Sequence, residues 1–249
     1  MEWAIVFILG AIIGSFLNVL ILRTPIDQNI SFPASHCMSC NTPLRAWHNV
    51  PILSWLILRG RCAFCGVKIS IQYPIVEVLS GLIFMCAAWK FGITYQAFAI
   101  AMVFALLMAL SVIDFRYKMV PDSINLSALT FAIFSATTFP DFITHFTNAL
   151  LFAGGFTLLR FYLSYAIKKE AMGEADIMIA ATMGAVLGIK LALVAVFLSA
   201  VLALPALLLT RTDDEESLQL PFIPFLAIAT WIVLMFDTQV SLYLEALYG

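Results

Sequence analysis

Long apolar runs dominate the chain, and polar residues gather in the short segments between them. Runs close to the roughly 20 residues that an α-helix needs to cross a bilayer recur along the whole sequence. We expect helical spans at residues 3–22, 74–89, 96–114, 122–139, 143–167, 176–189, 191–210 and 221–238. The pattern therefore predicts an all-α polytopic membrane protein with about eight transmembrane helices.

Composition supports lipid as the main solvent. Of the 249 residues, 63% are hydrophobic and only 11% are charged, with a mean hydropathy of +1.01. A water-soluble domain could not hide so much apolar surface. The net charge of −2 gives no basic footprint, so no nucleic-acid partner is expected. The first apolar run lacks a basic start and continues to Leu22, which predicts a retained helix and not a cleaved signal.

The basic residues predict the orientation. Ten of the 13 Lys and Arg residues lie in four segments that an eight-span count places on one side, namely 23–73, 115–121, 168–175 and 211–220. Loops rich in Lys and Arg face the cytoplasm, so both termini are expected outside. Of these four, only 23–73 is long enough to fold outside the bilayer. We therefore divide the chain into a first helix (1–22), a cytoplasmic loop subdomain (23–73) and a transmembrane core (74–249).

Two C-x-x-C pairs lie in that loop. Cys37 and Cys40 are separated by 21 residues from Cys62 and Cys65. Each pair directs two sulfurs at one ion, and two pairs complete a tetrahedral thiolate shell that suits zinc. Such a closed shell leaves no position for a reacting water, so the predicted zinc is structural. Gly66 follows the second pair, where we expect positive φ.

These cysteines have two other interpretations. They could form redox pairs or disulfides, but a cytoplasmic loop argues against stable disulfides. The fifth cysteine, Cys86, lies within an apolar run and is expected to be a small core residue.

Two carboxylates stand at the ends of apolar runs, on the predicted cytoplasmic side. Asp114 ends one run and Asp176 begins another. Carboxylates where helices enter lipid are costly, and each is by default a candidate functional residue. If these two meet, mutual repulsion favours one ionised and one protonated member, which can act as base and acid in peptide hydrolysis. Alternatively, Asp176 caps its own helix and Asp114 pairs with Arg116 or Lys118.

Several short segments resemble the prepilin peptidase family, and they occur in that family's order. They are Gly14 to Val19 (GSFLNV), the two C-x-x-C pairs, Asn49 to Trp55 (NVPILSW), Arg59-Gly60, Tyr73 to Glu77 (YPIVE), Ile113-Asp114 with Pro121-Asp122, and Met172 to Asp176 (MGEAD). The last resembles the family's G-x-G-D segment. Agreement among several segments is more specific than any one of them.

The resemblance implies a membrane aspartic endopeptidase of the bacterial cytoplasmic membrane, with Asp114 and Asp176 as the catalytic pair. Its substrate would be a type IV prepilin or pseudopilin, whose basic leader is removed at the cytoplasmic face. Many members with the zinc-bearing loop also N-methylate the new terminus with S-adenosylmethionine. This second activity is implied by the resemblance alone.

Some positions depart from the family pattern or have no assigned role. Ala175 replaces the third-position glycine of G-x-G-D, and it would displace Asp176 if the backbone there needed positive φ. Met178 stands where a lysine is often found. Arg160, within a span, either extends to the membrane surface or pairs with a carboxylate. Glu77 either caps its helix or contacts substrate or the methyl donor.

The sequence also allows two alternatives to an enzyme. One is an assembly scaffold that docks partners through the zinc loop. The other is a transporter with proton-binding carboxylates, although paired broken-helix halves are not evident.

Overall fold

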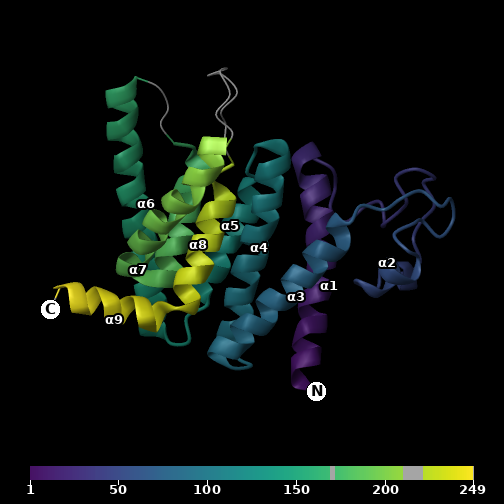
Figure 1. Cartoon of the computed structure of the whole chain (residues 1–249), viewed down its shortest axis with the longest axis horizontal. Coiled ribbons are helices and arrows are strands. Elements are labelled where there is room, and N and C mark those ends of the chain that lie inside the picture. The colour runs from purple at the N-terminus through teal and green to yellow at the C-terminus, as the bar shows by residue number, and fades with distance from the viewer. Residues whose placement is uncertain (169–171, 210–220, 249) are drawn as a thin grey trace. The chain divides into compact units, whose positions relative to one another are not determined.

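The computed structural model describes residues 1–168, 172–209 and 221–248, and these residues form helices and connecting loops without an extended strand. The elements are α1 (Glu2–Arg23), η1 (Thr24–Ile26), η2 (Ala46–Asn49), α2 (Leu53–Ile57), α3 (Gln72–Phe91), α4 (Tyr95–Tyr117), α5 (Asp122–Phe134), α6 (Phe139–Ile167), α7 (Glu174–Leu209), α8 (Ile223–Met235) and α9 (Asp237–Tyr248) (Figure 1). Two basic residues of the predicted cytoplasmic loops, Lys169 and Arg211, lie outside the described residues.

The helices confirm an all-α membrane protein. Among the described residues, α1, α3, α4, α6 and α7 are each long and apolar enough to cross a membrane, and α8 with α9 would add a sixth span. The predicted spans 3–22, 74–89, 96–114 and 143–167 each lie within one of these helices. The total of eight stays a prediction.

Two predicted spans end earlier than expected. In the predicted span 122–139, the helix α5 ends at Phe134. The next helix, α6, begins within the same span, and its N-cap is Thr138, whose hydroxyl accepts a hydrogen bond from the Asp141 N–H at 3.3 Å. The span 221–238 stops at Met235, where the chain bends by 80° into α9. The amphipathic segment α9 was not predicted. Both differences arise at short polar interruptions of apolar runs, Ser135 to Thr138 and Asp237.

The long element α7 contains two helical segments. Gly188 has φ 71° and ψ 166°, which no helix accommodates and which favours glycine. A straight helix of its 36 residues would be about 54 Å long, well beyond the bilayer core. Figure 1 shows both ends of α7 at the same end of the helix cluster, so the chain turns back at this break. The prediction of separate helices at 176–189 and 191–210 is confirmed in this respect.

The chain divides into two compact units, Met1–Ala101 and Met102–Gly249. In the first unit, α1 packs on α3 at very short range. A Cβ at Gly10 would lie 2.8 Å from Gly81 Cα, and one at Gly14 would lie 2.8 Å from Glu77 Cα. Glycine is therefore what allows these two backbones to meet.

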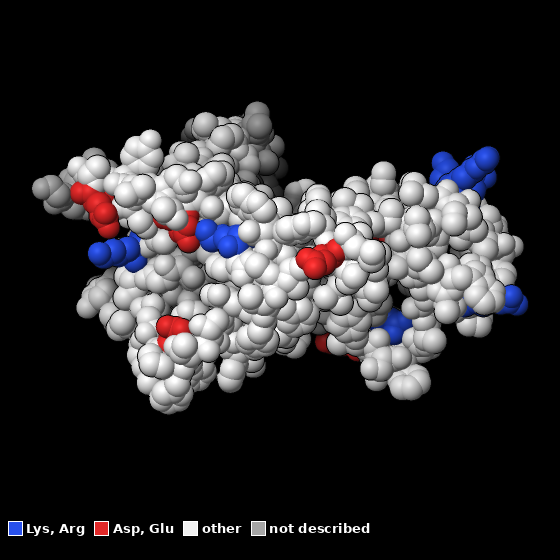
Figure 2. Space-filling view, turned by 90° about the horizontal axis from the view of Figure 1, so that it is seen from below, with Lys and Arg blue, Asp and Glu red and all other residues white. Residues whose placement is uncertain are grey.

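In the second unit, α7 packs against α5, α6 and α8. Much of α6 is not covered by the other described helices. The exposed fractions are 62% for Leu151, 60% for Leu158 and 66% for Phe161. Surface of this kind is suited to lipid. Figure 2, which views the molecule from below, shows that charged side chains are few among uncharged ones on that face.

We expect Gly184→Ala to destabilise the second unit, because its Cβ would lie 2.7 Å from Asn148 O and from Phe152 Cβ on α6. Overpacking of this kind costs about 1–3 kcal/mol. Gly154→Ala is the matched control, since nothing lies within 4 Å of a Cβ at that position. Thermal unfolding in detergent should show a lowered midpoint for Gly184→Ala alone. Equal midpoints for the two variants would contradict this packing.

Candidate active site and metal-binding loop

The carboxylate of Asp114 is placed by the C-terminal end of α4. Its side chain is buried, at 9% exposure, and its Oδ2 accepts a hydrogen bond from the Ile223 N–H at 3.2 Å. This donor is the first backbone amide of α8, a group that has no partner within its own helix. A helix start thus binds the buried carboxylate, which lowers the cost of placing it there.

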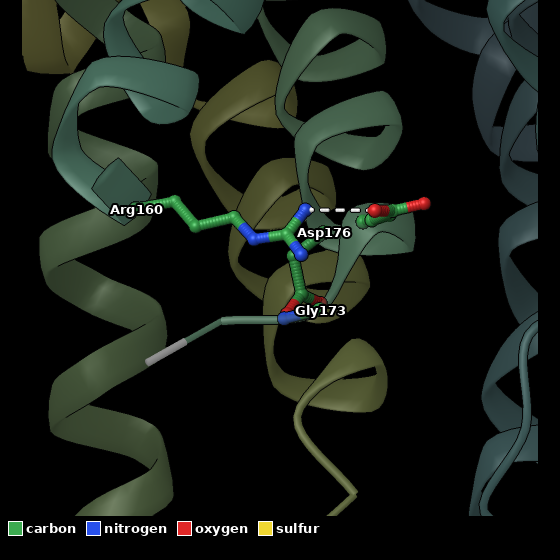
Figure 3. Close-up of polar contacts among 4 residues, drawn as sticks. Arg160, Gly173 and Asp176 are labelled. Atoms are coloured by element: carbon green, nitrogen blue, oxygen red, sulfur yellow. Dashed lines mark hydrogen bonds and ion pairs between the residues drawn. The ribbon is translucent and has the colours of Figure 1, made fainter. Parts of the chain in front are cut away.

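Asp176 lies in the first turn of α7. Its Oδ2 accepts a hydrogen bond from the Gly173 N–H at 3.2 Å, as Figure 3 shows. A side chain that reaches back to the residue before its helix forms half of a capping box. Asp176 therefore does cap its own helix, and its half-buried carboxylate still has a second oxygen for other partners.

The substitution of alanine in the G-x-G-D-like segment is tolerated. Ala175 is the second residue of α7, and neither it nor Gly173 adopts positive φ. The displacement of Asp176 that a positive-φ requirement would have caused does not arise.

The fold brings the two predicted carboxylates to one end of the second unit. Figure 1 shows both ends of α7 and the start of α8 at this end, and Asp114 is bonded to that start. Carboxylates that come into close contact can share one proton, and their placement at one end of the unit is the first requirement for such a pair.

Arg160 pairs with a neighbouring carboxylate. Its Nη1 lies 3.3 Å from Glu174 Oε1, drawn as the dashed line in Figure 3. The Glu174 side chain is 86% exposed, so in water the pair contributes little to stability. Arg160 therefore pairs with a carboxylate, as one of the two interpretations of this residue expected. The ion pair links α6 to the first turn of α7.

The four predicted metal ligands come together in the first unit. The sulfurs of Cys37, Cys40, Cys62 and Cys65 all lie within 4.8 Å of one another, and Cys37 Sγ is 3.8 Å from Cys65 Sγ. Sulfurs bound tetrahedrally at about 2.3 Å are separated by about 3.8 Å. The cluster therefore fits a metal such as zinc.

The loop backbone forms two matching turns around these sulfurs. The Cys37 N–H donates to Thr42 O at 3.1 Å, and the Cys62 N–H donates to Val67 O at 2.8 Å. The residue after each second cysteine has positive φ, 53° at Asn41 and 72° at Gly66. The expectation for Gly66 is confirmed, and asparagine takes the equivalent position because it tolerates this conformation.

Hydrogen bonds favour the thiolate form that a metal requires at Cys40 and Cys62, whereas burial and the neighbouring thiols raise the pKa of Cys65 to about 11. The side chain and backbone of Thr42 lower the pKa of the Cys40 thiol to about 6. The backbone amides of Cys65 and Phe64 lower the pKa of Cys62. Cys86, predicted as a core residue, is exposed on α3, because it lies on the face of the helix opposite to the buried residues Phe84, Ala87 and Ala88.

The loop is tied to α3 by a buried carboxylate. Glu77, 6% exposed, accepts a hydrogen bond from the Ile52 N–H at 2.7 Å and another from Ser15. Ile52 has φ 63°, an outlier for a β-branched residue. Nearby, Asn18 Nδ2 donates to Tyr73 O at 3.2 Å. Glu77 is thus neither a helix cap nor exposed.

Two residues of the site were missed by the sequence analysis. Ile223 contributes only a backbone amide, which has no signature in its side chain. Asn125, on α5, donates from Nδ2 to Ala175 O at 3.0 Å. A lone amide side chain within an apolar run was the available signal for Asn125.

These features define a polytopic membrane protein with a carboxylate pair at helix ends and a separate four-cysteine metal site. The model of the bacterial peptidase A24 N-terminal domain matches residues 8–91, and that of the type IV leader peptidase family matches residues 100–208. The chain belongs to the type IV leader peptidase family.

Curated relatives agree with this assignment. The prepilin leader peptidase/N-methyltransferase of Stutzerimonas stutzeri is 33% identical over 94% of this chain and 90% of its own length. The protein of the same name from Myxococcus xanthus is 40% identical over 73% of this chain and 55% of its own length. A type 4 prepilin-like proteins leader peptide-processing enzyme of Escherichia coli is 34% identical over 72% of this chain and 74% of its own length. No solved structure matches the chain.

Proposed function

We propose that this chain is a membrane aspartic endopeptidase that removes the basic leader of a type IV prepilin or pseudopilin, with Asp114 and Asp176 as its catalytic pair. The observation that carries the proposal is the placement of two acidic side chains, from distant parts of the sequence, at one end of a helix cluster: Asp114 is bonded to the start of α8, and Asp176 lies in the first turn of α7. The names of the relatives supply the substrate class.

The proposed chemistry needs one ionised and one protonated carboxyl group. The ionised group takes a proton from water, and the water oxygen attacks the carbonyl carbon of the scissile peptide. The protonated group gives its proton to the carbonyl oxygen. The C–N bond then breaks as the nitrogen gains a proton, which yields a free carboxyl group and a new amino terminus.

The remaining assignments are part of the same proposal. The ion held by Cys37, Cys40, Cys62 and Cys65 is zinc, and it stabilises the loop 23–73. S-adenosylmethionine would supply a methyl group to the new terminus, as the name N-methyltransferase indicates for the relatives. The loop and the carboxylate pair face the cytoplasm of a bacterial cell, both termini lie outside, and the division into 1–22, 23–73 and 74–249 describes the functional parts.

Incubation of the purified protein with a full-length prepilin tests the proposal. We expect a product lighter by the mass of the leader, and with S-adenosylmethionine present a product heavier than that by one methyl group. Mass spectrometry separates the two events. A substrate that stays intact would overturn the peptidase assignment, and cleavage without a mass gain would overturn methylation alone.

A further inference from the structure

Asn125 differs from the other polar side chains of α5. The hydroxyls of Ser127 and Thr130 are exposed and bond to carbonyls of their own helix, at Ser123 and Leu126. Asn125 is fully buried, at 0% exposure, and its Nδ2 donates to Ala175 O on α7 at 3.0 Å. Burying an amide is costly, so this contact has to return a benefit specific to its position.

The acceptor of this hydrogen bond adjoins the proposed catalytic residue. The carbonyl of Ala175 belongs to the planar peptide unit that joins it to Asp176. The hydrogen bond to this oxygen therefore restrains the orientation of the peptide plane that contains the Asp176 Cα. The Gly173 N–H holds the other end, at Asp176 Oδ2. The carboxylate is thus restrained through its backbone by α5 and through its side chain by the residue before α7.

The second polar atom of Asn125 is also informative. Its Oδ1 is buried, and no donor among the described residues lies within hydrogen-bonding distance. The amide orientation itself is fixed, because only the nitrogen can donate to a carbonyl oxygen. A buried amide oxygen without a donor is costly, so each such group in a protein calls for an explanation.

We infer that Asn125 is a positioning residue for peptide cleavage, which holds the first turn of α7 so that Asp176 stays directed toward Asp114. The inference rests on the proposed function. Loss of the amide would leave substrate binding intact and misplace one carboxylate. A misplacement on the scale of 1 Å lowers the rate of an enzyme by on the order of 100-fold.

The test compares Asn125→Leu and Asn125→Asp with the wild type. Leucine has a similar volume without the amide, and aspartate has the same shape and, in its ionised form, no donor. For both we expect kcat on a prepilin to fall by on the order of 10- to 100-fold while KM changes less than about twofold. Amide hydrogen exchange of the first turn of α7 should become faster. Ser127→Ala is the matched control on the same helix and should change neither measurement.

The outcomes separate this inference from the proposed function. If the wild type cleaves, Asp176→Asn does not, and both Asn125 variants keep kcat within about twofold, the inference alone fails. A rise in KM without a loss of kcat would also overturn it, as would unchanged exchange in α7. If the wild type does not cleave, both proposals fall. The aspartate variant keeps the test decisive if the leucine variant does not fold.

Discussion

Asp114→Asn and Asp176→Asn should each abolish leader cleavage while leaving the protein folded in the membrane. Asparagine keeps the shape of the side chain but cannot accept a proton from water or donate an acidic one. General acid–base catalysis contributes on the order of 10²- to 10⁴-fold to a rate, and removing either member breaks the pair. Single-turnover cleavage of a prepilin, followed by mass spectrometry, measures the loss.

The matched control for these variants is Glu245→Gln, which neutralises an exposed carboxylate on α9. It should cleave at the wild-type rate. Wild-type cleavage by either aspartate variant would show that the pair is not the catalytic centre. Loss in the control as well would indicate a general effect of removing negative charge.

Removing the metal should have the second large effect, and it should be confined to the loop. Cys62→Ser replaces the most buried of the four ligands, at 6% exposure, and leaves three sulfurs that bind zinc far more weakly. Structural zinc contributes on the order of 10 kcal/mol to folding in small domains. We expect the metal content to fall from about one ion per chain to well below it, and residues 24–71 to become sensitive to protease.

The control for this variant is Cys86→Ser, which changes an exposed thiol outside the cluster. Its metal content and protease pattern should match the wild type. The helices of the second unit should also survive Cys62→Ser, because their packing does not involve the loop sulfurs. A full metal content in Cys62→Ser would exclude the four-cysteine site.

Those parts of the fold that depend on hydrophobicity were predictable from the sequence. Runs of apolar residues located α1, α3, α4 and α6, and the spacing of Cys37, Cys40, Cys62 and Cys65 located the metal cluster. These signals are local, since each depends on residues that are close together in the chain. The positions of Asp114 and Asp176 at helix ends were predictable for the same reason.

Other features depended on contacts that no local pattern encodes. The Ile223 amide reaches Asp114 across 109 positions, and any residue except proline would offer the same N–H. Asn125 meets Ala175 only because α5 packs on α7. The end of α5 at Phe134 was missed because the polar turn that follows, Ser135 to Thr138, is short and apolar residues resume at Phe139. Tertiary packing and backbone groups account for what the sequence did not reveal.

The hydrogen bond between Glu77 and Ile52 has a consequence for how the loop acquires its ion. It pins the midpoint of residues 24–71, so the segment behaves as two shorter arcs, each with one pair of thiols. Halving a chain changes its closure entropy by only about 0.6 kcal/mol, so the gain in energy is small. The gain in geometry is larger, because both thiol pairs already face a common point when an ion arrives. Metal binding then requires only that two preformed thiol pairs come together, and not that a long flexible loop brings four separate thiols to one point.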